Sequence, residues 1–158
     1  MNARYVAPAR IALVAVALGS VALQVLIPLV SFETGWLYPE VRHLSLPYAV
    51  AGVLAVAAAQ VVLLAVWNLL SHVRRATLYT DAAAGWIPVM RAAVVVATLL
   101  PAAVCLHLLV VAQVGGPGVI LFLFAVLALG AAAYLLLGVL GGVLSDARAE
   151  HDELAEVI

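Results

Sequence analysis

Residues 92–144 read AAVVVATLLPAAVCLHLLVVAQVGGPGVILFLFAVLALGAAAYLLLGVLGGVL and contain no Asp, Glu, Lys or Arg. The Gly-Gly-Pro-Gly sequence at 115–118 divides this stretch into apolar segments at 92–114 and 119–144. Each segment is as long as the roughly 20 apolar residues that an α-helix needs to cross a hydrocarbon core about 30 Å thick. Because the turn is so short, the two helices must run antiparallel. The stretch therefore predicts a hairpin of two membrane-spanning helices.

Two more apolar segments, at 11–30 and 46–70, precede this hairpin and also lack charged residues. The whole chain is 68% hydrophobic and 9% charged, whereas a soluble domain has roughly 25% charged residues. The segments must be helices, because lipid cannot satisfy free backbone groups and the sequence lacks the alternating pattern of a barrel. We predict an all-α integral membrane protein whose single domain, 1–158, is a four-transmembrane-helix bundle.

The arginines predict how this bundle is oriented. Six of them fall on one side of a four-span arrangement, namely Arg4, Arg10, Arg74, Arg75, Arg91 and Arg148, and only Arg42 falls on the other. The side rich in Arg is expected to be cytoplasmic. Both termini, the loop 71–91 and the tail 145–158 are therefore predicted to be cytoplasmic. A chain with no lysine and much Ala, Val, Leu and Gly is typical of a GC-rich bacterial genome, so we expect a bacterial inner membrane.

Small residues predict where the helices pack. Helices in lipid associate by close approach of their backbones, and glycines four residues apart mark such faces. Gly138 and Gly142 form such a pair, and Gly130 lies on the same four-residue row. The alternative is that glycine and alanine are simply abundant in this chain. Because glycine lowers helix propensity and still recurs here, we favour packing.

Four polar residues within the predicted spans form two layers. At 1.5 Å per residue, Gln24 and His107 both lie about 6 Å to the outer side of their span centres. Gln60 and Tyr134 both lie about 3–4 Å to the inner side. Interhelical hydrogen bonding is one interpretation. A ligand or proton site lined by His107 is the other, although no charged residue accompanies the histidine within the spans.

No motif predicts catalysis or a cofactor. Haem needs two well-placed axial ligands, and His107 is the only histidine within a span. Clustered Cys and His for zinc are absent from the sequence, as are nucleotide and hydrolase fingerprints. The net charge of -1 gives no reason to expect direct nucleic-acid binding. We expect a protein that is not an enzyme and has no catalytic residues, metal site or cofactor.

The loop and tail resemble a known family. The run RRATLYTD at 74–81 follows the second span, and the chain ends in ELAEVI at 153–158. Both resemble the bacterial family of small four-helix membrane proteins called domain of unknown function 2975, and the resemblance extends over essentially the whole chain. The family has no established activity. Its members are often encoded beside a small helix-turn-helix protein, which implies a regulatory partner.

These observations lead to two functional hypotheses. The first is a membrane protein that engages a cytoplasmic partner, such as a helix-turn-helix regulator, through the inner loop and acidic tail. Its candidate partner or lipid surface consists of Arg74, Arg75, Asp152, Glu153 and Glu156. The second is a small transport or ligand-binding subunit that uses the polar layers. Besides the lipid bilayer, a second copy of the chain is a candidate partner, through the glycine row.

Overall fold

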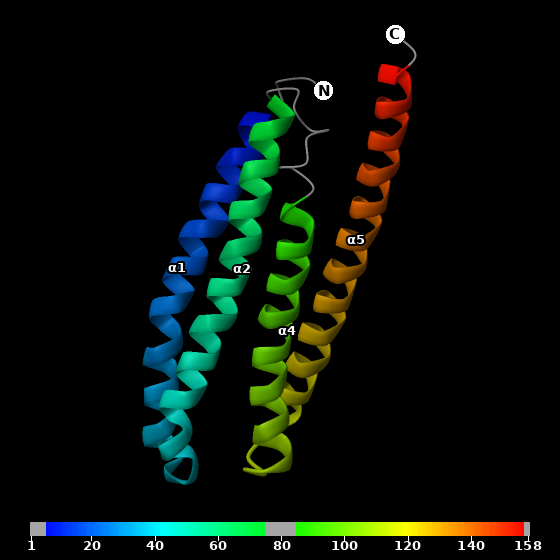
Figure 1. The fold of residues 1–158 in the computed structure, drawn as a ribbon. Coiled ribbons are helices and arrows are strands. Elements are labelled where there is room, and N and C mark those ends of the chain that lie inside the picture. The colour runs from blue at the N-terminus through cyan, green and yellow to red at the C-terminus, as the bar shows by residue number, and fades with distance from the viewer. Residues whose placement is uncertain (1–5, 75–84, 157–158) are drawn as a thin grey trace.

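The computed structural model describes residues 6–74 and 85–156, and these residues are almost entirely helical (Figure 1). The long helices are α1 (Val6–Leu37), α2 (Ser45–Arg74), α4 (Trp86–Val110) and α5 (Pro117–Glu156), and a short 3-10 helix, η2 (Pro39–Leu44), joins α1 to α2. Each long helix includes a stretch long and apolar enough to cross a membrane, which confirms the four predicted spans. Arg75 lies outside the described residues.

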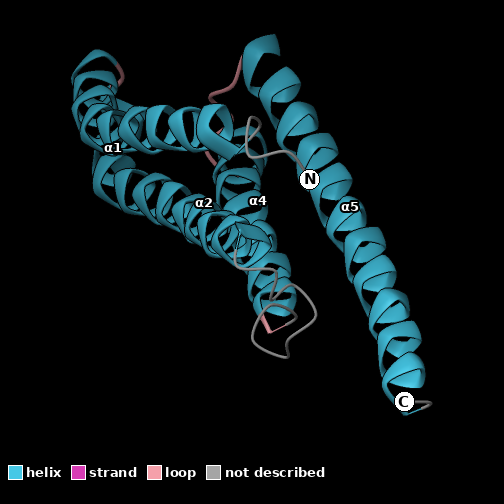
Figure 2. Ribbon diagram, turned by 90° about the horizontal axis from the view of Figure 1, so that it is seen from above, coloured by secondary structure: helices cyan, strands magenta, loops and turns pink. Residues whose placement is uncertain are grey.

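The four long helices form an open row in the order of the chain. The main contacts join α1 to α2, α2 to α4, and α4 to α5. Seen from above, α1 and α5 lie on opposite sides of the molecule, and α5 diverges from the other helices (Figure 2). In the described residues α1 and α5 are therefore not main neighbours, and the row does not close on itself. Hydropathy identifies helices that cross the membrane, but it does not identify their neighbours.

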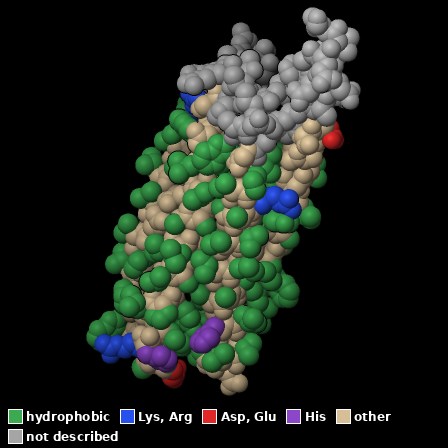
Figure 3. Space-filling model, in the orientation of Figure 1, with side chains coloured by type: hydrophobic (Ala, Val, Ile, Leu, Met, Phe, Trp, Pro, Cys, Tyr) green, Lys and Arg blue, Asp and Glu red, His purple; other side chains and the backbone are tan. Residues whose placement is uncertain are grey.

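The buried residues lie mainly on the two central helices. The small side chains Ala49, Ala55 and Ala65 of α2 are buried, as are Met90 and Cys105 of α4. On α5, no residue whose side chain is described is buried. Hydrophobic side chains also cover much of the outward face (Figure 3). A soluble protein would hide such side chains, so their exposure fits a molecule surrounded by lipid.

The two ends of the row differ in content. At one end α1 begins, α2 ends, α4 begins and α5 ends, and we call this the terminal end (Figure 1). At the other end, the turn end, lie η2 and the connection from α4 to α5 (Figure 1). The start of α1 and the end of α5 therefore lie on the same side of the row, as an even number of spans requires.

The segment 31–45, between the first two predicted spans, is mostly helical. Helix α1 continues to Leu37, where the Tyr38 N–H donates to the Thr34 carbonyl at 2.9 Å. The Ser31 hydroxyl donates to the Ser45 carbonyl at 2.7 Å, and Ser45 is only 5% exposed. Gly35 makes this approach of α1 and α2 feasible, because a Cβ there would overlap the Ser45 hydroxyl.

The second connection is a tight turn, as predicted, but α4 ends earlier than residue 114. The His107 carbonyl accepts from the N–H groups of Val111 and Ala112 at 2.9 and 3.0 Å. Gln113 then adopts a positive φ of 52°, which reverses the chain. Pro117 occupies the first position of α5, where its missing N–H costs nothing.

Candidate functional site

A reciprocal amide pair links α1 to α2. Gln24 Nε2 donates to Gln60 Oε1 at 3.2 Å, and Gln60 Nε2 donates to Gln24 Oε1 at 3.1 Å. Gln60 Nε2 also donates to Ser20 Oγ at 3.0 Å, and Ser20 Oγ donates to the Ala17 carbonyl at 2.7 Å. An amide in an apolar medium is costly unless it is hydrogen-bonded. The cluster therefore satisfies its own polar groups and joins the two helices.

A second polar contact links α2 to α4. The Tyr48 hydroxyl lies 2.7 Å from His107 Nδ1, and which of the two donates depends on the tautomer of the imidazole. The rings meet edge to face, with centroids 6.0 Å apart and an interplanar angle of 71°. His107 thus has an interhelical partner, but one that was not identified from the sequence. The signal that sequence reasoning missed is Tyr48 itself, a polar aromatic residue near the start of the second predicted span.

The interhelical contacts do not follow the two layers of matched depth. Gln24 pairs with Gln60 rather than with His107. Tyr134 faces Arg91, whose guanidinium carbon lies 4.2 Å from the ring centroid, rather than Gln60. The physical reason is the open row, in which α1 is not a main neighbour of α4, nor α2 of α5. Equal depth allows a contact only between helices that are adjacent.

The glycine prediction needs a similar correction. A Cβ on Gly130 would lie 2.8 Å from Thr98 Cβ, and one on Gly141 would lie 3.3 Å from Ile87 Cγ2. A Cβ on Gly138 or Gly142 would meet nothing within 4 Å. Within one chain, α5 therefore packs on α4 through Gly130 and Gly141, and Gly138 and Gly142 make no such close contact. Packing between copies stays a prediction.

Helical geometry explains which glycines face α4. A residue advances about 100° around an α-helix, so Gly141 lies only about 20° from Gly130. Gly138 and Gly142 lie about 80° and 120° away from it. The four-residue interval drifts around the helix, and the contact follows the mean period of 3.6 residues instead.

Two arginines near the terminal end stack on aromatic rings. The guanidinium carbon of Arg10 on α1 lies 5.1 Å from the ring centroid of Trp67 on α2, and its Nη2 lies 3.3 Å from the Ser71 hydroxyl. Arg91 on α4 covers Tyr134 of α5 in the same way. In both arginines the Nε atom is buried without a hydrogen-bond partner. Sequence reasoning placed Arg91 in the loop 71–91, whereas α4 already begins at Trp86.

The remaining candidate residues lie at the terminal end or beyond it. Arg74 is the last residue of α2. Asp152, Glu153 and Glu156 all belong to α5, which continues far past the predicted span end at 144. Their side chains lie outside the described part of the structure.

The described residues offer an apolar groove but no cluster of reactive groups. Cavities of about 500 Å³ lie along α1, α2 and α4 and share Leu23, Ile27, Tyr48 and Val104 in their walls. The Tyr48 hydroxyl is their most polar shared feature, and His107 already engages it. Among the residues whose side chains the structure describes, no group of three or more His, Cys, Asp or Glu could hold a metal ion.

Comparison with known proteins gives one match. A family model described as protein of unknown function DUF2975 matches residues 29–158, in agreement with the resemblance seen in the loop and tail. No curated protein matches the chain. No solved structure matches it either.

Proposed function

We propose that this chain, which belongs to the DUF2975 family of proteins of unknown function, is a non-enzymatic membrane protein that presents an acidic helix to a soluble cytoplasmic partner. The observation that supports this proposal is the continuity of α5 from Pro117 to Glu156. The part of α5 suited to the membrane ends at Val143. The remainder is about 13 residues, or about 20 Å of helix at 1.5 Å per residue.

The projecting segment is strongly acidic. Its sequence contains Asp146, Glu150, Asp152, Glu153 and Glu156 against a single arginine, Arg148. Positions 146, 150 and 153 follow at intervals of four and three residues, which places them in one row of the helix. Anionic headgroups repel such a row, whereas a basic protein surface attracts it.

The segment also begins from a preformed helix. A free peptide of this length is marginally helical in water, because the first turn is costly to nucleate. Here the spanning part of α5 supplies the nucleus, so the segment only extends an existing helix. A partner would then bind a segment that is already helical, so binding would not have to order the backbone of that segment.

The proposed orientation follows from the arginines. Arg10, Arg74 and Arg91 lie in the halves of their helices nearest the terminal end, whereas Arg42 lies in η2 at the turn end. The positive-inside rule favours a cytoplasmic terminal end, in a bacterial inner membrane. The partner class that fits is a soluble protein with a basic face, such as a small helix-turn-helix regulator.

The transport or ligand-binding alternative has less support. The amides of Gln24 and Gln60 bind each other, and the polar contact of His107 is with Tyr48. These groups are paired within the row and do not line an enclosed path. A path built between copies of the chain remains a separate hypothesis, tested by the oligomeric state in mild detergent.

The experiment is affinity purification of the chain from its own cells in mild detergent. We expect truncation before Ala149 to leave membrane insertion intact but to abolish capture of a soluble partner. The double variant Glu150→Gln/Glu153→Gln should capture less of the partner, because it removes two charges of the acidic row. The amount captured should also change less with salt concentration than it does for the wild-type chain. The matched control is Glu40→Gln, which removes a carboxylate at the turn end.

The proposal fails if the truncated chain retains every interactor of the full chain, or if the full chain captures none. Reporter fusions at Ile158 and within η2 test the orientation independently. A C-terminus on the outer side of the membrane would contradict a cytoplasmic partner, whatever the truncation shows.

A further inference from the structure

Each of the two arginine–aromatic pairs lies at the end of an apolar groove that is nearest the terminal end, and the two grooves are similar. Between α1 and α2, next to the Arg10–Trp67 pair, a groove of about 280 Å³ runs toward the middle of the row. Between α4 and α5, beside the Arg91–Tyr134 pair, lies a groove of about 270 Å³. Both volumes lie just below the roughly 300–1,000 Å³ of small-molecule pockets, so each groove would hold part of an elongated ligand.

The residues that line the two grooves lie at the same sequence intervals from the arginine and from the aromatic residue. On the arginine-bearing helices, the lining residues three, four and seven places after each arginine are Leu13, Val14 and Ala17 in α1, and Val94, Val95 and Thr98 in α4. These intervals place them on one helix face, below the arginine.

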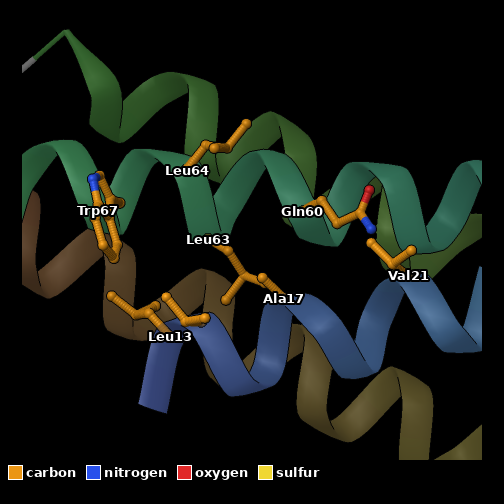
Figure 4. A pocket seen from close by; sticks show the side chains of 8 residues that line it. Leu13, Ala17, Val21, Gln60, Leu63, Leu64 and Trp67 are labelled. Atoms are coloured by element: carbon orange, nitrogen blue, oxygen red, sulfur yellow. The ribbon is translucent and has the colours of Figure 1, made fainter. Parts of the chain in front are cut away.

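The aromatic-bearing helices repeat this match in reverse. Leu64, Leu63 and Gln60 lie three, four and seven places before Trp67, and Ala131, Gly130 and Leu127 lie at the same intervals before Tyr134. Figure 4 shows Leu13 beside Trp67 at one end of the first groove, and Val21 with Gln60 at the other. The same arrangement therefore occurs twice, once in each half of the row.

The arginines have unused hydrogen-bonding capacity. Their described partners are neutral: Trp67 and Ser71 for Arg10, and Tyr134 for Arg91. Each Nε is buried and unpartnered. The terminal Nη edge of a guanidinium stacked on a ring can still donate to two oxygens of a phosphate.

The position of Arg91 makes this unused capacity significant. Its residue lies seven places from the centre of the span Trp86–Val110, which is about 10 Å at 1.5 Å per residue. That depth is within the half-thickness of about 15 Å of a hydrocarbon core. A cation there is costly unless its side chain extends toward the headgroups or a polar group is drawn in to meet it.

We propose that each arginine–aromatic pair binds one anionic phospholipid of the leaflet at the terminal end. The phosphate contacts the guanidinium edge, and an acyl chain lies in the apolar groove that runs from it. A lipid uses both parts of the arrangement, since the charge lies at the end of the groove nearest the headgroups. A free anion would leave the groove unused.

The test is native mass spectrometry of the full chain in mild detergent, with phosphatidylglycerol or with phosphatidylcholine of the same acyl chains. The wild-type chain should retain up to two phosphatidylglycerol molecules. Arg10→Gln and Arg91→Gln should each weaken one of them about fivefold, which corresponds to about 1 kcal/mol for an arginine near the headgroups. The control is Arg42→Gln, since Arg42 also stacks on an aromatic ring, Trp36 at 4.3 Å, but Trp36 lines neither groove, whereas Trp67 and Tyr134 do.

A second pair of variants tests the groove without changing any charge. Ala131→Phe fills the groove between α4 and α5, whereas Ala132→Phe adds the same ring one position away, at a residue that does not line it. Only Ala131→Phe should lose one lipid. Because both positions are exposed, both variants should fold, which gel filtration and circular dichroism can verify.

Several results would overturn the proposal. Retention of phosphatidylcholine equal to that of phosphatidylglycerol would show that the charge is not recognised. Displacement of the lipid by excess inorganic phosphate would indicate a general anion site instead. Equal loss in Arg42→Gln, or no difference between the two phenylalanine variants, would show that the arginine–groove arrangement does not determine binding.

Discussion

Gly130 is the position where the structure predicts the sharpest effect of adding one methyl group. In Gly130→Ala, the new Cβ would lie 2.8 Å from Thr98 Cβ, closer than packed side chains allow. Thr98 cannot easily turn away, because it is β-branched and its hydroxyl donates to the Val94 carbonyl at 2.7 Å. The two helices must therefore separate or shift.

The magnitude follows from two opposing terms. Overpacking costs about 1–3 kcal/mol, and alanine regains about 1 kcal/mol of helix propensity relative to glycine. Gly130→Ala should thus lower the free energy of unfolding by about 0–2 kcal/mol. Gly138→Ala, where the new Cβ meets nothing within 4 Å, gains propensity without overpacking. The difference between the two variants should be about 1–3 kcal/mol.

Cys105 provides the assay. It is the single cysteine of the chain and is 5% exposed, so its reaction with a thiol-reactive dye reports unfolding. Dye labelling across a titration with sodium dodecyl sulfate would give the unfolding midpoint of each variant. Equal midpoints for Gly130→Ala and Gly138→Ala, or a lower midpoint for Gly138→Ala, would refute the assignment of the contact face of α5.

The same labelling assay checks two other contacts. Gln24→Leu and Gln60→Leu should each destabilise the chain, and the double variant should cost less than their sum, with a coupling of about 0.6 kcal/mol and at most about 1.7. Strict additivity would mean that the reciprocal amide pair contributes nothing. Gly35→Ala should have a lower unfolding midpoint than Gly19→Ala, by an amount corresponding to about 1–3 kcal/mol, because its Cβ overlaps the hydroxyl of buried Ser45. Gly19→Ala should not lower the midpoint, because its new Cβ would meet nothing within 4 Å. An equal drop in the midpoint for Gly35→Ala and Gly19→Ala would contradict the reasoning.

Sequence reasoning succeeded where a property depends on one segment alone. Hydropathy located all four spanning helices, and the loop and tail motifs identified the family. The helix ends were less predictable. Helix α1 continues to Leu37 through Glu33 and Thr34. A polar residue ends the apolar stretch that suits the lipid, but it does not end the helix.

Sequence reasoning failed where a property depends on two helices together. The depth of Gln24 and of His107 was counted along each helix separately. Contact also requires that the two helices are neighbours and that each side chain lies on the face turned toward the other helix. The open row separates α1 from α4 and leaves Gln60 as the neighbour of Gln24. No single-sequence pattern reports which helices are neighbours, so the pairing could not be derived.

The open row also has a consequence for how the chain is made. Each long helix after α1 packs against the long helix synthesised just before it. A newly inserted helix can therefore pack against a helix that is already in the membrane, and no two helices that have already packed together need to separate. Contacts of this kind close short loops and favour rapid assembly. During translation α5 would be added after α1, α2 and α4, at the edge of a row that is already in place.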